Sequence, residues 1–127
     1  MVFLIQITGV CKRSINSKKK GKTGELELVH KLKEYGYDCR RTAQFCGNTG
    51  EADDVVGLDY IHIECKRNEK LNIDNAIEQA IRDTKDNKIP AVFHRKNRKG
   101  WLVTLRLDDF MKIYGEYYSS MKLAERE

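Results

Sequence analysis

Three stretches of the chain repeat apolar residues at every third or fourth position, which is the spacing of an amphipathic helix. The clearest follows Asn72, a candidate N-cap, and has the apolar stripe Ile73, Ala76, Ile77, Ala80 and Ile81. An earlier helix is expected to begin at Thr23 and to stop at Gly36, with the stripe Leu28, Val29, Leu32 and Tyr35. A last helix is expected from Asp108 or Asp109 through Tyr118.

The other apolar runs are short and typical of strands. Strands are expected at residues 37–45, 54–56, 60–66, 91–93 and 101–107, with a loop at 47–50. The third alternates most clearly: Ile61, Ile63 and Cys65 share one face, and His62, Glu64 and Lys66 share the other. This order of elements predicts an α/β or α+β fold, in which helices flank a central mixed β-sheet.

Length and composition fit one globular domain. The chain has 127 residues, of which 40% are hydrophobic and 34% charged, and a formal net charge of +5. Residues 1–22 contain basic side chains and no acid, so we expect a basic N-terminal arm there and a single domain at 23–127. The arm could contact phosphates or be a solvated lead-in. The cationic bias suits nucleic acid, although on its own it is a weak indication.

The cysteines and the N-terminus bear on the cellular compartment. Cys11, Cys39, Cys46 and Cys65 form no CxxC pair, which disfavours a zinc knuckle and is typical of reduced thiols in a cytosolic protein. Residues 1–10 are apolar but short, and no run reaches transmembrane length. We therefore expect a cytoplasmic protein without a membrane partner.

Ionisable residues on the second and third expected strands form the most informative cluster. The short turn at 57–59 predicts antiparallel pairing that places Asp54 near Ile63 or Glu64. Glu64 and Lys66 share a face. Two adjacent carboxylates repel each other unless a cation lies between them, and Mg²⁺ prefers such oxygen ligands. A bound ion would activate water and the lysine would stabilise charge on phosphorus, as phosphodiester hydrolysis requires.

Glu25 is a third candidate acid. It precedes Leu28, Val29 and Leu32 by three, four and seven residues, so it lies on the core-facing stripe of its helix. A carboxylate there is costly unless it is paired or close to a cation. The alternative is a first-turn glutamate that complements the helix dipole.

Three runs together resemble the PD-(D/E)xK nuclease superfamily: residues 24–28 (GELEL), 54–57 (DVVG) and 61–67 (IHIECKR). Within it the chain resembles the small Holliday junction resolvases of archaea and phages, and residues 71–83, 92–95 and 101–104 resemble the phage branch. The resemblance covers about residues 20–115. It implies a restriction-endonuclease-like core with a five-stranded mixed sheet, a homodimer, Mg²⁺ or Mn²⁺, and paired nicks in a four-way DNA junction. The setting would be a bacterial or phage-infected cytoplasm.

The resemblance also implies roles for individual residues. Asp54, Glu64 and the backbone carbonyl of Cys65 would be metal ligands, Lys66 the catalytic lysine, and Glu25 the helix glutamate near the metal. The family's Pro-Asp is Asp53-Asp54 here, which leaves Asp53 as an alternative ligand. Gln79 would make a polar contact to the site, or be an ordinary helix-flank glutamine.

Basic residues outside the cluster are candidate phosphate contacts, with a solvated surface as the alternative. They are Lys18, Lys19, Lys20, Lys22, Arg40, Arg41, Arg95, Lys96, Arg98 and Lys99.

The sequence thus predicts a Mg²⁺-dependent endodeoxyribonuclease that resolves Holliday junctions as a homodimer. One alternative is a nuclease of the same superfamily that cuts flaps, nicks or restriction sites. A less favoured one is a catalytically silent DNA-binding module. The C-terminal stripe Phe110, Ile113, Tyr114 and Tyr117 would pack on its own sheet or form an interface.

Overall fold

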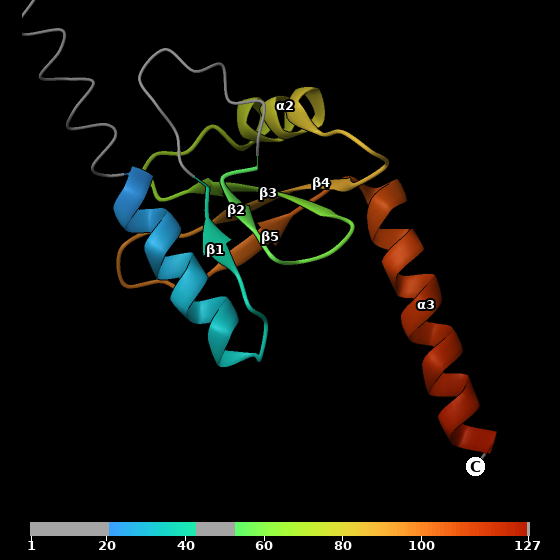
Figure 1. Ribbon diagram of the computed structural model, residues 1–127. Coiled ribbons are helices and arrows are strands. Elements are labelled where there is room, and N and C mark those ends of the chain that lie inside the picture. The colour runs from blue at the N-terminus through green and yellow to red at the C-terminus, as the bar shows by residue number, and fades with distance from the viewer. Residues whose placement is uncertain (1–20, 43–52, 127) are drawn as a thin grey trace, which may run out of the picture.

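The computed structural model describes residues 21–42 and 53–126. Its centre is a five-stranded sheet in the order β1-β2-β3-β4-β5, shown in Figure 1. The strands are β1 (Arg40–Arg41), β2 (Val55–Val56), β3 (Ile61–Lys66), β4 (Ile89–His94) and β5 (Leu102–Thr104). Among these five described strands only β3 and β4 pair in parallel, so the sheet is mixed, as the sequence predicted.

The first helix and the crossover helix cover opposite faces of this sheet. The first helix spans residues 21–34, α2 spans Ile73–Asp83, and α3 spans Leu107–Arg126. α2 is the crossover that the parallel pair β3 and β4 requires. Asn72 caps it as expected, because its side chain accepts a hydrogen bond from the Asn75 amide at 3.1 Å.

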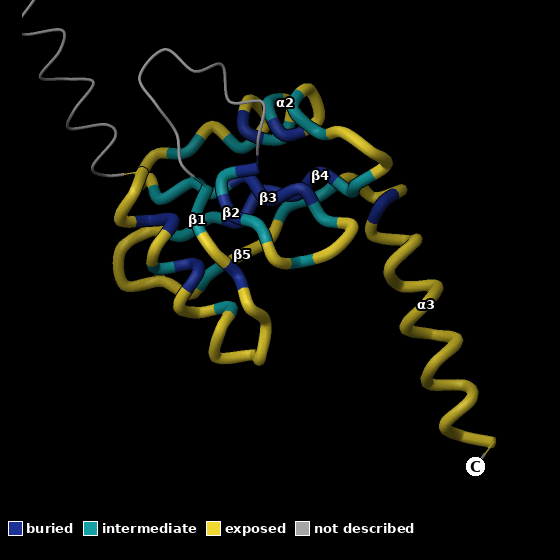
Figure 2. Tube along the Cα trace, in the orientation of Figure 1, coloured by how far each residue is buried: buried dark blue, intermediate teal, exposed yellow. Residues whose placement is uncertain are grey.

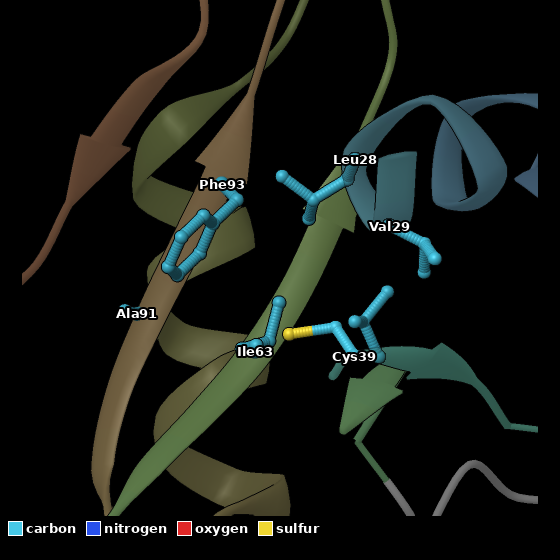
Figure 3. Close-up of a cluster of buried hydrophobic side chains, with 7 residues drawn as sticks. Leu28, Val29, Cys39, Ile63, Ala91 and Phe93 are labelled. Atoms are coloured by element: carbon cyan, nitrogen blue, oxygen red, sulfur yellow. The ribbon is translucent and has the colours of Figure 1, made fainter. Parts of the chain in front are cut away.

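Alternation along β3 divides the interior into two parts. On one face, Ile63 packs with Leu28 and Val29 of the first helix and with Phe93 of β4 (Figure 3). On the other face, Ala76 and Ala80 of α2 pack on β4, and His62 and Glu64 are buried. The predicted alternation is therefore confirmed, and it places ionisable residues beneath α2.

A glycine permits the tight packing of β1 on the turn after β2. Gly57 has a φ of +128°, and a Cβ there would lie 2.6 Å from the Cα of Cys39. A side chain at this position would push the two segments apart, and with them β2, which directly follows Asp54.

Several predicted boundaries are wrong. Thr23 does not cap the first helix, because the helix already includes residues 21 and 22. Tyr35 lies in the turn after that helix and is 69% exposed, so it is not part of the buried stripe. The strand expected at 91–93 is longer at both ends, because β4 spans Ile89–His94 and so includes Pro90. The strand expected at 101–107 ends at Thr104, and α3 then begins at Leu107 and continues to Arg126, well past Tyr118.

Other predictions fall partly outside the described residues. The strand expected at 37–45 is seen only as β1, and residues 43–45 and the loop at 47–50 lie outside the described ranges. The same holds for residues 1–20 of the predicted arm, while Gly21 and Lys22 belong to the first helix. Among the helices in residues 21–42 and 53–126, none is long and apolar enough to span a membrane.

Candidate active site

The pairing of β2 with β3 brings the predicted acids together. Val55 lies opposite Ile63, so Asp54 comes opposite Glu64, on the same face of the sheet. Two hydrogen bonds attach Asp54 to β3. The Asp54 amide donates to the Ile63 carbonyl at 3.0 Å, and the Cys65 amide donates to Asp54 Oδ2 at 2.8 Å. The Asp54 carboxylate is thereby oriented by the strand that carries Glu64.

Glu64 is buried in a way that disfavours its charge. The residue is 2% exposed. Burial raises the pKa of its carboxyl group to about 7, the charge of Asp54 adds to the shift, and His62 opposes it. A cation bound between Asp54 and Glu64 would stabilise the ionised form of both carboxyl groups.

A chain of charged groups links Glu64 to His62, Asp53 and Lys88. His62 is fully buried, and its Nε2 lies 3.0 Å from Glu64 Oε1. Its Nδ1 lies 2.6 Å from Asp53 Oδ1, in a direction that makes no good hydrogen bond, so that contact is chiefly electrostatic. Asp53 Oδ2 in turn lies 3.4 Å from Lys88 Nζ. Burial alone would lower the pKa of His62, but the hydrogen bond to Glu64 and the charge of Asp53 outweigh it and raise the pKa.

This chain separates the two aspartates. Asp53 is engaged by His62 and Lys88, away from the metal position that the sequence suggested, whereas Asp54 adjoins Glu64. The geometry therefore favours Asp54 over Asp53 as the ligand.

Lys66 extends from the same face of β3 as Glu64. Its Nζ donates a hydrogen bond to Gln79 Oε1 of α2 at 3.0 Å. Gln79 therefore makes a polar contact to the site, as the resemblance implied, and is not an ordinary helix-flank glutamine. This hydrogen bond holds the Lys66 ammonium group between the end of β3 and α2. Lys66 follows Glu64 by two residues and lies on the same face of the strand.

Glu25 approaches from the first helix and is buried. Burial and the charge of Asp54 raise its pKa, while a hydrogen bond from Arg41 Nε opposes them. The helix comes this close because Gly24 packs on Arg67: a Cβ at Gly24 would lie 2.6 Å from the Cβ of Arg67. Arg41, a candidate DNA contact, instead neutralises Glu25.

Side chains alone do not complete a metal centre here. In residues 21–42 and 53–126, no three His, Cys, Asp or Glu side chains are arranged to hold a metal ion. The Cys65 thiol is not a suitable ligand, because burial and the nearby carboxylates raise its pKa and keep it protonated. The fitting donors are two carboxylates and backbone oxygen, a hard set that suits a divalent ion which also keeps water ligands.

The candidate DNA contacts fall into three groups. Arg41 and Arg95 pair with acids: Arg41 with Glu25, and Arg95 with Glu27, whose Oε1 accepts from Arg95 at 2.6 Å in an ion-pair network that includes Arg67. Lys22, Arg40, Lys96, Arg98 and Lys99 are exposed. Lys18, Lys19 and Lys20 lie outside the described residues.

Comparison with known proteins decides the family. The model of a family described as "Phage putative PDDEXK endonuclease" matches residues 16–126. The chain belongs to this endonuclease family. Nucleases of the PD-(D/E)xK type generally use divalent metals.

A search of solved structures also gives a match. This PDDEXK endonuclease is similar to the Holliday junction resolvase Hjc of the hyperthermophile Archaeoglobus fulgidus, with a TM-score of 0.49 and 17% identity over 66% of this chain and 75% of that chain. No protein with curated functional information matches the chain significantly.

Sequence reasoning missed the residues that position the site of this endonuclease. It places His62 on the face of Glu64 without a role, and it treats Asp53 only as a rival ligand and Arg41 only as a DNA contact. One signal was available: alternation along the strand places His62 on the same face as Glu64 and Lys66, so a candidate site on that face includes this histidine.

Proposed function

We propose that this endonuclease hydrolyses DNA phosphodiester bonds with one or more Mg²⁺ ions bound at Asp54 and Glu64. The observation that carries the proposal is the convergence of these two carboxylates with Lys66, on a face where Glu64 is buried and its pKa is raised to about 7. A silent DNA-binding module has no need of a buried, repelling carboxylate pair.

Each residue has a distinct part in this proposal. Asp54, Glu64 and the carbonyl of Cys65 would hold the ion, which when bound polarises a phosphate oxygen and lowers the pKa of a coordinated water. His62 would keep Glu64 turned toward the ion. Lys66, held by Gln79, would place its positive charge where negative charge develops on the phosphate. Glu25 would complete the polar wall of the site.

For the substrate, we propose a four-way DNA junction cut by a homodimer. The support is the resemblance of three motif runs to the junction resolvases. A four-way junction has two-fold strand symmetry, and each chain offers one Asp54/Glu64/Lys66 site, so symmetric paired cuts require two copies. A flap, a nick or a restriction site is the competing substrate, because the catalytic residues serve any phosphodiester.

A cleavage assay tests the chemistry and the substrate together. The full chain is incubated with an immobile four-way junction, a flap, a nicked duplex, linear duplex and single strand, each with Mg²⁺, with Mn²⁺ or with chelator. We expect cleavage of the junction at least about tenfold faster than of the duplex, with paired symmetric nicks, and none in chelator. Asp54→Asn and Glu64→Gln should abolish cleavage and retain DNA binding.

The outcomes separate the alternatives. Metal-dependent cutting of flaps or duplex in preference to the junction would keep the nuclease and replace the substrate. Full cleavage in excess chelator would overturn the metal site, and cleavage by the Asp54→Asn variant at the wild-type rate would overturn the assignment of Asp54.

A further inference from the structure

The C-terminal helix α3 is almost unsupported by the rest of the described chain. It extends away from the sheet in Figure 1, and it is exposed along nearly its whole length in Figure 2. Asp109, near its start, is its only buried residue. Most of the stability of a helix in a protein comes from packing of its apolar face, so a helix of 20 residues normally has a packing partner.

The surface of α3 is strongly apolar. Its large apolar side chains are between 42% and 71% exposed: Leu107, Phe110, Met111, Ile113, Tyr114, Tyr117, Tyr118, Met121 and Leu123. The ring centroids of Phe110 and Tyr114, and those of Tyr114 and Tyr117, are 6.3 Å apart, so the aromatic groups form one continuous stripe. Contiguous exposed apolar surface of this extent marks an interaction site. The packing of this stripe on its own sheet, one of the two sequence interpretations, is not what the structure shows.

The spacing along the stripe indicates what kind of partner fits it. Apolar residues recur at alternating intervals of three and four over the whole helix: Leu107, Phe110, Tyr114, Tyr117, Met121 and Ala124. This is the a/d pattern of a coiled-coil seam, in which side chains of one helix fit between those of a facing helix. The natural occupant is therefore another helix that carries a seam of the same period.

We propose that α3 pairs in an antiparallel manner with α3 of a second copy of this chain, and so forms the two-fold interface of a homodimer. This inference deepens the dimer of the proposed function. In antiparallel register the seam matches itself throughout: Leu107 faces the second copy's Ala124, Tyr114 faces its Tyr117, and Phe110 faces its Met121. A two-fold axis repeats each contact and closes the assembly at two copies.

The helix dipoles and the buried area agree with this arrangement. Antiparallel pairing brings the N-terminal end of each α3, with its acidic first turn, beside the C-terminal end of the other, so that opposite dipole ends meet, whereas parallel pairing would align like with like. Four half-exposed aromatic side chains supply about 400 Å² per copy. With the aliphatic residues, the total buried over both copies reaches about 1,500 Å², the size of a standard stable interface.

Analytical ultracentrifugation of the full chain, without DNA or metal, tests the pairing. We expect a dimer at micromolar concentration. The seam variant Tyr114→Glu/Tyr117→Glu should raise the dimer dissociation constant at least about a hundredfold, since it places charges in the centre of the interface. Ser119→Glu, on the exposed face opposite the seam, is the matched control and should leave the constant within about threefold. Thermal unfolding reports whether each variant is folded.

Disulfide cross-linking tests the direction, with wild type as the background for native cysteines. A mixture of Leu107→Cys and Ala124→Cys proteins should cross-link. Leu107→Cys alone should not, because two copies of position 107 would lie roughly 25 Å apart along an antiparallel pair. Cross-linking of Leu107→Cys with itself would overturn the antiparallel arrangement.

Three further results would overturn the interface. A dimer that the seam variant does not weaken would place it elsewhere. A monomer whose α3 is protected from hydrogen exchange would assign the stripe to another segment of the same chain, and a monomer with unprotected α3 would show that the stripe has no partner. In each case metal-dependent cleavage by the same protein would leave the nuclease proposal standing, whereas a dimer without cleavage would refute the nuclease alone.

Discussion

Replacing Glu64 by glutamine should stabilise the metal-free protein while it destroys the proposed metal site. The carboxylate is buried beside Asp54, and the folded protein therefore favours its protonated form. Glutamine keeps the shape and keeps an oxygen that can accept a hydrogen bond from His62, but it never ionises. The substitution thus removes a charge that the fold disfavours without leaving a cavity.

The size and pH dependence of the effect follow from the pKa. A carboxyl group with a pKa of 4.5 when unfolded and about 7 when folded destabilises the fully ionised protein by about 3 kcal/mol. Well below pH 4.5 the group is protonated in both states and costs nothing. As pH rises toward 7 the unfolded state loses its proton first, so stability falls, and above the folded pKa the loss is complete. The advantage of Glu64→Gln should grow from below about 1 kcal/mol at pH 5 to about 3 kcal/mol at pH 8.

Urea unfolding in chelator at pH 5, 6, 7 and 8 measures this difference directly. Glu78→Gln, on the exposed side of α2, removes the same formal charge and should change stability by less than about 0.5 kcal/mol at every pH. Mg²⁺ at a hundred times its dissociation constant should then stabilise wild type alone, by about 2.7 kcal/mol. An advantage that is constant from pH 5 to pH 8, or a Glu64→Gln protein that is less stable at pH 8, would refute the reasoning.

Three further predictions concern cleavage and DNA binding. Lys66→Ala should slow cleavage at least about a hundredfold and retain metal binding measured by calorimetry, and a rate near wild type would make Lys66 a structural residue only. Asp53→Asn should retain metal binding that Asp54→Asn loses, because Asp53 contacts His62 and Lys88; equal losses would make both aspartates ligands. Neutralising the exposed basic tip should weaken DNA binding and reduce its salt dependence by about 0.9 in the log–log slope for each phosphate that the tip no longer neutralises, and an unchanged slope would assign the tip to solvated surface. The tip residues are Lys96, Arg98 and Lys99.

The sheet and the acid pair could be predicted because their determinants are local. Strict alternation in β3 assigns each side chain to a face, and the short turn before it fixes the antiparallel pairing with β2 to within one residue. Position along the strand is then enough to bring Asp54 opposite Glu64. The start of α2 was equally accessible, since an N-cap and five periodic apolar residues all indicate the same helix.

The partners of the site could not be predicted, because they depend on contacts between distant segments. Arg41 reaches Glu25 across 16 residues and Lys88 reaches Asp53 across 35 residues, and no periodicity in the sequence links either pair. The length of α3 was missed for a different reason. Its apolar stripe continues past Tyr118 through Met121 and Leu123. The end of the helix could not be inferred from packing on the sheet, because this part of α3 is exposed and does not pack on it.

The way these partners are distributed explains how a buried charged site is held in one geometry. Asp54 is oriented by the backbone of β3, Glu64 by a histidine of its own strand, Lys66 by α2, and Glu25 by β1. Each ionisable group of the candidate site thus depends on a second group, and most of these second groups come from another element. A charge in this position would otherwise rotate toward solvent or lose its ionised form. Because the supporting contacts tie the first helix, three strands and α2 to one point, displacement of any one of these elements should impair cleavage before it unfolds the protein.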